Sequence, residues 1–204
     1  MSAIEKGPLV LASASAVRAR LLSAAGVPFR VMPADLPEAE LRGELHAAGR
    51  RAAEAAAELA RRKALAVAEQ VPARDLLLGA DQLLEFEGEW LGKCADREAA
   101  SRLLRRLRGR RHRLFTAAVL VREKTVVWHR VERVELEMRP FSDAFLRRYL
   151  DRCGEAVLRA VGAYELEGPG AQLFARIEGD FFAVLGLPLL PLLEALRREA
   201  VLES

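Results

Sequence analysis

The segment near the amino terminus carries residue types that bind phosphate. An apolar run at residues 8–12 is followed by Ser13-Ala14-Ser15 and by a segment of helical pattern that contains Arg18. Serine is a favoured helix N-cap, and a helix N-terminus presents unpaired N–H groups and a partial positive charge. Phosphate binds well there, and an arginine in the first turn adds a charge-assisted hydrogen bond. Ser13, Ser15 and Arg18 are therefore candidate phosphate ligands, although a capped helix with a solvated arginine has the same pattern.

Two carboxylates and two lysines are candidates for the chemistry of a triphosphate. Asp81 directly follows the apolar run 76–80, and α/β proteins place ligand chemistry at the carboxyl ends of strands. Glu38 lies in a proline-flanked segment, and oxygen ligands hold the divalent metals that accompany triphosphates. Lys63 and Lys93 supply fixed positive charge. Each also has an ordinary interpretation, as a turn aspartate or a surface charge, and spacing alone does not show that they meet.

Strands and helices alternate in the half of the chain that carries most of these residues. Short strands are predicted at 8–12, 29–32 and 76–80, the last ending at Asp81, and a helix is predicted from Ser15 to Gly26. A loop is predicted at 33–40, followed by one alanine-rich helix from about 45 to 70 that carries Lys63 and packs beside the third strand.

The second half of the chain is also predicted to contain both strands and helices. Residues 83–91 read as a hairpin that turns near Glu87-Gly88, and helices are predicted at 96–108, from Ser142 and at 191–199. Further strands are predicted at 114–122, 126–138, 172–177 and 181–185. The mixture predicts an α/β protein.

Composition limits the class of protein. The 204 residues suit one domain, or one domain built from two lobes, and 51% hydrophobic with 30% charged residues is typical of a globular chain. No apolar stretch approaches the roughly 20 residues of a membrane helix, and no signal peptide is evident, so a cytoplasmic protein is expected. Cys94 and Cys153 lack metal spacing and are interpreted as reduced thiols, and the three scattered histidines argue against zinc.

A cluster of arginines leaves a second function class open. The net charge of +3 does not by itself indicate nucleic-acid binding. The cluster lies on and just after a predicted helix, and its members are Arg102, Arg105, Arg106, Arg108, Arg110 and Arg111. A solvated basic face is the preferred interpretation, with nucleic-acid binding as the alternative.

Six segments, in order, resemble the Maf family of nucleoside triphosphate pyrophosphatases. They are LVLASAS, LARRKA, GADQ, GEWLGK, GAYELEG and RIEGDFFAVLGLPL, and they cover nearly the whole chain. The resemblance implies one domain over residues 1–204, with an elongated mixed β-sheet, flanking helices and two lobes around a cleft, as in inosine-triphosphatase-like folds. It implies hydrolysis between the α- and β-phosphates of a nucleoside triphosphate, a divalent cation (Mg, Mn or Co), a housecleaning role and a homodimer. The family has also been linked to inhibition of septum formation.

The same resemblance implies roles for individual residues. Ser13, Ser15 and Arg18 would bind the phosphates, and Lys63 and Lys93 would hold the triphosphate and stabilise charge in the transition state.

The same resemblance implies roles for three acidic residues. Glu38 and Asp81 would serve the metal, and Asp81 would also be the base that activates water. Glu167 stands where the family has a Gln or Glu that contributes to the active site.

Three positions depart from the commoner family pattern in the same direction. Val17 stands where many members have the first arginine of a pair, so one phosphate contact is missing or comes from elsewhere, for example Arg20. Val17, Gln82 and Glu167 together resemble the branch that acts on 7-methyl-GTP, some members of which accept UTP or CTP; the other branch prefers dTTP and UTP. The missing arginine also leaves open a degenerate protein that binds nucleotide, or regulates cell division, without cutting.

Overall fold

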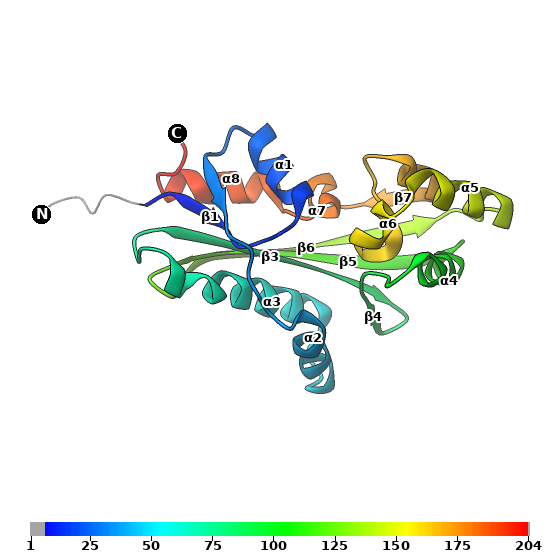
Figure 1. Cartoon of the computed structure of the whole chain (residues 1–204), viewed down its shortest axis with the longest axis horizontal. Coiled ribbons are helices and arrows are strands. Elements are labelled where there is room, and N and C mark those ends of the chain that lie inside the picture. The colour runs from blue at the N-terminus through cyan, green and yellow to red at the C-terminus, as the bar shows by residue number, and fades with distance from the viewer. Residues whose placement is uncertain (1–6, 204) are drawn as a thin grey trace, which may run out of the picture. The chain divides into compact units, whose positions relative to one another are not determined.

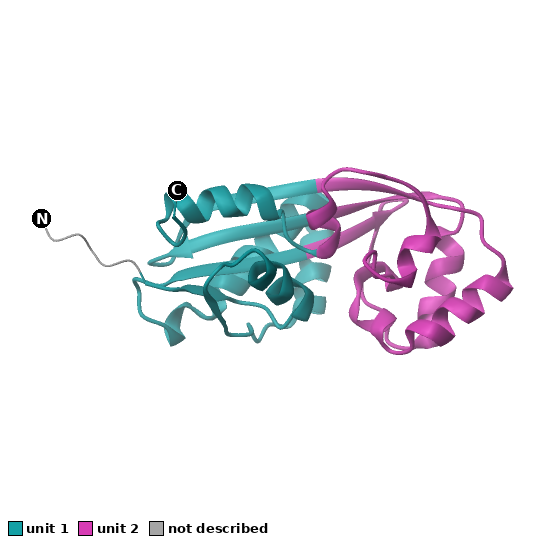
Figure 2. Ribbon diagram, turned by 90° about the horizontal axis from the view of Figure 1, so that it is seen from above, with its two compact units in different colours: residues 1–81, 116–132, 186–204 teal, residues 82–115, 133–185 magenta. Residues whose placement is uncertain are grey.

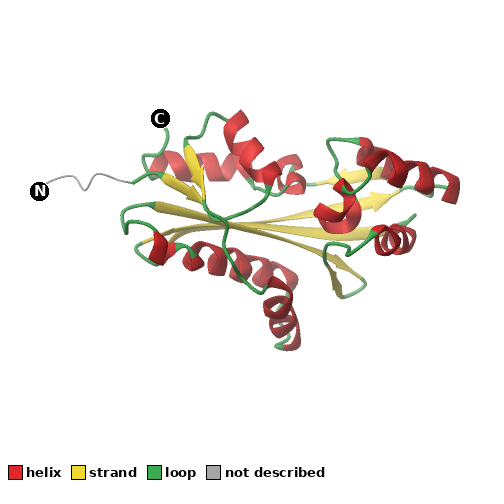
Figure 3. Ribbon diagram, viewed as in Figure 1, coloured by secondary structure: helices red, strands yellow, loops and turns green. Residues whose placement is uncertain are grey.

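The computed structural model describes residues 7–203, which form a mixed seven-stranded β-sheet with helices on its faces (Figures 1 and 3). The strand order is β2-β1-β3-β5-β6-β7, and β4 pairs with β3 off this path. The α/β prediction is therefore confirmed.

The element bounds are as follows. The strands are β1 (Leu9–Leu11), β2 (Phe29–Val31), β3 (Leu76–Phe86), β4 (Glu89–Leu91), β5 (Arg111–Arg122), β6 (Thr125–Met138) and β7 (Phe174–Glu178). The α-helices are α1 (Ala16–Ala24), α2 (Glu38–Ala47), α3 (Ala52–Ala66), α4 (Arg97–Leu107), α5 (Asp143–Cys153), α6 (Ala156–Arg159), α7 (Phe181–Leu185) and α8 (Leu189–Arg198). Short 3-10 helices are η1 (Ala68–Gln70), η2 (Val161–Ala163) and η3 (Pro169–Leu173). None of the helices in the described range is long and apolar enough to cross a bilayer.

The chain divides into two compact units, each assembled from separate stretches of sequence (Figure 2). The first unit comprises the residues up to Asp81, together with Thr116–Glu132 and the stretch from Gly186 onward. The second unit comprises Gln82–Phe115 and Arg133–Leu185. The long strands β3, β5 and β6 contribute residues to both units.

The first unit is built around three parallel strands. β1 pairs with β2 from Leu9 opposite Phe29, and with β3 from Leu9 opposite Leu76. Helix α3 covers one face of these strands, and α1 and α8 lie on the other (Figure 1). A strand covered on both faces is expected to be apolar throughout, and all of β1 is buried.

Helix α3 lies unusually close to β3. A Cβ atom on Gly79 would lie 1.9 Å from the carbonyl oxygen of Ala60 and 2.9 Å from the backbone nitrogen of Ala64. The helix presents a face of small, fully buried side chains that lets its backbone approach the sheet: Ala55, Ala56, Ala60 and Ala64. Only glycine leaves room for this contact.

The second unit has its own hydrophobic core. The inward-facing leucines of α4 and α5 pack against the far ends of the long strands, where Val134, Leu136 and Met138 alternate with more exposed residues. β3 and β4 form the predicted hairpin, and its turn residues Glu87 and Gly88 both have positive φ, as a tight two-residue turn requires.

Two expectations about the first unit are corrected by the structure. The alanine-rich segment forms two helices, α2 and α3, because the chain turns at Gly49 with φ of 68°. Glu38, expected in a loop, is consequently the first residue of α2. β3 does not end before Asp81 but continues to Phe86, because its second half pairs with β4.

A third expectation fails in the second unit. Residues 181–185, predicted as a strand, form helix α7. The carboxylate of Asp180 accepts a hydrogen bond from the backbone N–H of Ala183 at 2.6 Å and so caps this helix. An apolar run of five residues does not by itself distinguish a strand from a buried helical turn.

The close approach at Gly79 predicts the effect of adding one methyl group. Gly79→Ala forces α3 away from β3, and we expect the free energy of unfolding to fall by about 1–3 kcal/mol. Urea denaturation of the purified variant measures the loss.

Gly43→Ala is the matched control. Gly43 lies within α2 with open space around its Cβ position, so alanine there should be neutral or stabilising by up to about 1 kcal/mol. Equal stabilities for the Gly79 and Gly43 variants would contradict the close-packing argument.

Candidate active site

One buried lysine in the first unit joins two of the predicted carboxylates. The Nζ atom of Lys63 lies 2.5 Å from Oδ1 of Asp81 and 3.0 Å from Oε2 of Glu38. The Lys63 and Asp81 side chains are only 8% and 5% exposed, whereas that of Glu38 is 42% exposed. The structure therefore brings together three candidates whose sequence spacing could not show that they meet.

The fold explains how these groups converge. The last residue of β3 that pairs with β1 is Leu78, so Asp81 lies just beyond the carboxyl end of β1 although it is in the middle of β3. Lys63 follows Ala60 by one helical turn on the face of α3 that contacts Gly79, which carries its ammonium group over Asp81.

The second oxygen of Asp81 makes no hydrogen bond. Oδ2 is buried and has no hydrogen-bond partner among the described residues. A buried carboxylate oxygen without a partner is costly, which is typical of an atom that serves a ligand. No cluster of three or more His, Cys, Asp or Glu side chains able to hold a metal occurs in residues 7–203. Mg²⁺, however, needs only one or two protein carboxylates when phosphates and waters complete its shell, so Asp81 and Glu38 fit such a site.

Arg18 ties three segments of the first unit together. Its Nε atom donates to the carbonyl oxygen of Gly186 at 3.0 Å, and Nη1 donates to Ser13 Oγ at 3.1 Å and to the carbonyl oxygen of Ala80 at 2.8 Å. β1 ends before it can pair with Ala80, so the guanidinium satisfies a strand carbonyl that would otherwise be buried without a donor. The first-turn arginine is thus buried and not solvated.

The charge of Arg18 is held among neutral acceptors. Burial lowers the pKa of Arg18, and the nearby charges of Asp81 and Glu38 act in the opposite direction. Two cations, Arg18 and Lys63, thus face two carboxylates, and the charges within this cluster balance.

The two serines have local structural roles that leave their hydroxyl hydrogens available. Ser15 is the N-cap of α1, where its Oγ accepts from the backbone N–H of Arg18 at 3.4 Å. Ser13 Oγ accepts from the backbone N–H of Ser15 at 3.2 Å. Neither hydroxyl donates to another residue in the described part of the chain, so both donors can face a phosphate oxygen.

Two predicted site residues belong to the second unit. Lys93 is exposed in the loop that follows β4 and makes no ion pair with any residue that the structure describes. Glu167 is exposed in the turn before η3, where the backbone N–H of Gly168 donates to the carbonyl oxygen of Glu165 at 3.2 Å.

A buried His–Tyr pair, which the sequence reasoning missed, anchors the segment that carries Glu167. Nε2 of His112 lies 3.0 Å from the hydroxyl oxygen of Tyr164. The ring of Tyr164 packs edge-on against that of Phe174, with 4.9 Å between the ring centroids. The hydroxyl of Tyr149 donates to the carbonyl oxygen of Ala163 at 3.0 Å. The buried positions of β5 alternate from His112 to Thr116, and this alternation is the sequence signal that could have identified an inward-facing histidine.

Gln82 contacts backbone in the second unit. Its Nε2 group donates to the carbonyl oxygens of Ala183 and Val184 at 2.9 and 3.1 Å, at the end of α7. The amide therefore stabilises the short helix that was expected to be a strand.

The arginine cluster of the second unit is compensated by acidic side chains. Each member forms an ion pair: Arg102 with Glu98, Arg105 and Arg108 with Asp143, Arg106 with Glu89, Arg110 with Glu87 and Arg111 with Glu137. This arrangement agrees with the preferred interpretation of the cluster as a solvated face.

Burial of His112 predicts a dependence of stability on pH. Burial lowers the pKa of His112 from 6.5 to about 4. Between these values the unfolded chain binds a proton that the folded chain does not, so the free energy of unfolding should decrease as pH falls, by up to about 3 kcal/mol. Urea denaturation of the wild type and His112→Phe at about pH 7 and about pH 4.5 measures this. The variant should be less stable at neutral pH and lose less on acidification; parallel losses in the two proteins would contradict the assignment.

Comparison with known proteins agrees with the order of motifs in the chain. The family model described as Maf-like protein matches residues 8–199. Proteins from Granulibacter bethesdensis and Paramagnetospirillum magneticum, both named nucleoside triphosphate pyrophosphatase, are 46% and 47% identical to the chain, covering 95% of it and 98% and 99% of their own lengths. A Brucella abortus protein named 7-methyl-GTP pyrophosphatase is 42% identical over 96% of the chain and 98% of its own length. The chain therefore belongs to the Maf family.

Proposed function

We propose that this chain hydrolyses a nucleoside triphosphate between its α- and β-phosphates, releasing a nucleoside monophosphate and pyrophosphate. The observation that carries the proposal is the buried Lys63 ammonium between Asp81 and Glu38, with one Asp81 oxygen unpartnered. The names of the relatives from Granulibacter and Paramagnetospirillum support the reaction type.

The charge balance of the cluster supports a requirement for further cations. Arg18 and Lys63 are offset by Asp81 and Glu38, so a triphosphate meets no surplus of positive charge there. We infer that a divalent cation (Mg, Mn or Co), which Asp81 and Glu38 would hold, supplies this positive charge, and Lys93 stays a proposed phosphate ligand on the strength of its motif alone. When bound, such a metal neutralises phosphate oxygens and lowers the pKa of a coordinated water.

The chain's own groups would position the substrate and accept a proton. Lys63 has three N–H donors, of which two face Asp81 and Glu38, and the third is available to a phosphate oxygen. The hydroxyls of Ser13 and Ser15 would donate to phosphate oxygens. An oxygen of Asp81 would accept the proton of the attacking water. Positioning and charge stabilisation are the main contributions that phosphoryl transfer requires of a protein.

For the substrate we favour 7-methyl-GTP, with UTP, CTP and dTTP as further possibilities. The name of the Brucella relative supports this choice, as do Val17 and Glu167. Methylation at N7 places positive charge on the guanine ring, which a carboxylate stabilises better than an amide does. Gln82 donates to the end of α7. We assign base selection to Glu167, because its carboxylate carries the charge that would stabilise the methylated ring.

The proposed reaction also suggests a cellular role for the protein. We propose a cytoplasmic housecleaning role, and we retain the homodimer as a proposal of the same kind. A role limited to binding, or to regulation of septum formation, is not favoured, because the Lys63–Asp81 pair is intact despite Val17.

Removing the charge of Asp81 tests the reaction. Asp81→Asn should lower kcat/KM for pyrophosphate release by at least about 100-fold, because the amide cannot accept the water proton. A panel of 7-methyl-GTP, UTP, CTP, dTTP, ATP and GTP with Mg²⁺ and Mn²⁺ provides the measurement. Asp151→Asn, at a carboxylate with a 67% exposed side chain in the second unit, is the matched control and should retain full activity. Absence of turnover by folded wild-type protein on every nucleotide would refute the proposal.

Glu167→Gln tests the assignment of base selection. We expect the ratio of kcat/KM for 7-methyl-GTP to that for UTP to fall about tenfold or more, since a charged acceptor becomes a neutral amide. The same substitution at Glu165, two residues earlier, should leave the ratio unchanged. A ratio that Glu167→Gln does not alter would place base recognition elsewhere.

A further inference from the structure

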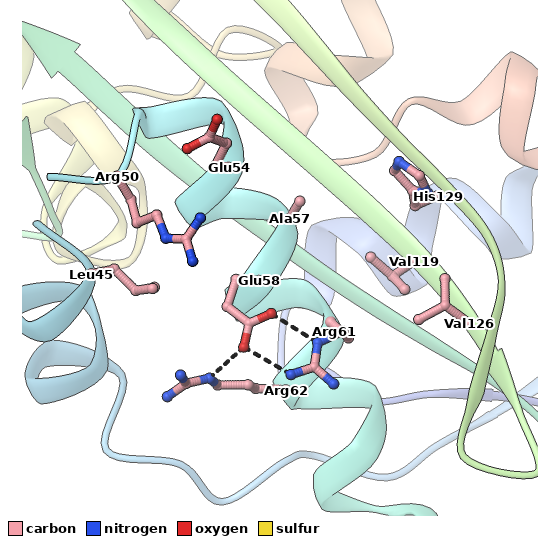
Figure 4. Close-up of a pocket in the computed structure, with 10 residues that line it drawn as sticks. All are labelled: Leu45, Arg50, Glu54, Ala57, Glu58, Arg61, Arg62, Val119, Val126 and His129. Carbon is pink, nitrogen blue, oxygen red and sulfur yellow. Dashed lines mark hydrogen bonds and ion pairs between the residues drawn. The ribbon is translucent and has the colours of Figure 1, made fainter. Parts of the chain in front are cut away.

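A pocket of about 500 Å³ opens in the first unit on the α3 side of the sheet (Figure 4). Its walls come from the end of α2, from α3 and from the hairpin formed by β5 and β6. Its volume lies within the range of small-molecule sites, and none of the candidate catalytic residues lines it. It is therefore separate from the Lys63–Asp81 cluster.

Two arginines in this pocket are held in place by one carboxylate. Glu58 accepts from Nε of Arg61 at 2.8 Å, from Nη2 of Arg61 at 2.9 Å and from Nε of Arg62 at 2.8 Å. These bonds, chiefly those from Arg61, lower the pKa of Glu58 to about 2, so the arrangement persists at neutral pH. Both guanidinium groups are thereby fixed in position before any ligand binds.

The fixed arginines retain donors for a ligand. Nη1 of Arg61 and both Nη groups of Arg62 make no hydrogen bond within the described range; Glu44 lies 3.9 Å from Arg62, beyond hydrogen-bond distance. Arg50 forms neither a hydrogen bond nor an ion pair with any described residue, and Figure 4 shows its guanidinium group turned toward the side of α3 that carries Glu58.

The charge in the pocket is positive overall. The lining carries three arginines and two glutamates; of the residues just outside it, Arg51 is bonded to Glu54 and Glu44 forms an ion pair with Arg62. Planar guanidinium groups with free donors recognise phosphate oxygens in a bidentate manner. Val119, Val126 and the ring of His129 line the pocket from the strands, and Leu45 lines it from the end of α2 (Figure 4).

We propose that this pocket binds a small phosphate monoester that carries an apolar or aromatic group, such as a nucleoside monophosphate. The arginines bind the phosphate, and the valines and His129 pack against the ring. Arg62 and Lys63 are adjacent on α3 but point about 100° apart around the helix. The same helix therefore carries the pocket on one side and the catalytic lysine on another, which suits an effector site. This inference does not depend on the proposed reaction.

Calorimetric titration with guanosine monophosphate tests the proposal directly. The full chain should bind it, and Arg50→Gln and Arg62→Gln should each weaken this binding about tenfold or more, as expected when a charge-assisted hydrogen bond is lost. Arg50 is exposed and unbonded, so Arg50→Gln should fold normally and keep kcat/KM unchanged. Arg147→Gln, which removes an exposed arginine of the second unit, is the matched control and should bind like the wild type.

Two further binding measurements distinguish a ligand in this pocket from one bound at the Lys63–Asp81 cluster. Lys63→Met should leave the Arg50-dependent binding in place, because Lys63 does not line the pocket. Inorganic phosphate should bind about tenfold more weakly than guanosine monophosphate, since it cannot use the apolar wall. Binding that Lys63→Met abolishes, that neither arginine substitution weakens, or that inorganic phosphate matches in affinity would overturn the proposal. Each readout is independent of turnover.

Discussion

The close contact between α3 and β3 is the constraint on which the candidate site depends. Because Gly79 has no side chain and α3 presents alanines, the helix backbone lies against the strand. Lys63, one turn beyond Ala60, then meets Asp81. Burying such a pair costs desolvation energy that the attraction between the charges does not reliably return. A pair of this kind, with one carboxylate oxygen left unbonded, is better explained by chemistry than by stability.

The hydrogen bonds of Arg18 are a second structural constraint on the site. They show that the prediction of Arg18 as a phosphate ligand needs refinement. The arginine is already bonded to Ser13, Ala80 and Gly186, so its first role is to fix the loop between β1 and α1 against β3. Fixing this loop sets the positions of the serine hydroxyls before a ligand binds, and preorganisation of this kind lowers the entropy cost of binding. Valine at position 17 leaves this tie intact, so Val17 does not count against the proposed reaction.

Local sequence signals predicted the parts of the site that depend on neighbouring residues. The apolar runs gave β1 and the start of β3, and Ser15 was correctly predicted as a helix cap. The predictions that were wrong concern elements whose structure depends on contacts between distant segments of the chain. Asp81 lies within β3 because β4 pairs with the far half of that strand, and α7 forms where the side chains of Asp180 and Gln82 bond its backbone.

In three places in this protein, cationic side chains are paired with carboxylates. The extent of this pairing indicates where an anion could bind. In the Lys63–Asp81 cluster the positive and negative charges balance, so the proposed triphosphate would need a further cation there. On the second unit every arginine of the 102–111 cluster forms an ion pair with an acidic side chain, and Arg105 and Arg108 share Asp143. In the pocket beside α3, Glu58 orients Arg61 and Arg62 but leaves donors unused, and Arg50 interacts with Glu54 only through its charge, without an ion pair in the described range. The proposal of an anion site in this pocket therefore rests on its surplus of oriented donors and not on the net charge of the chain.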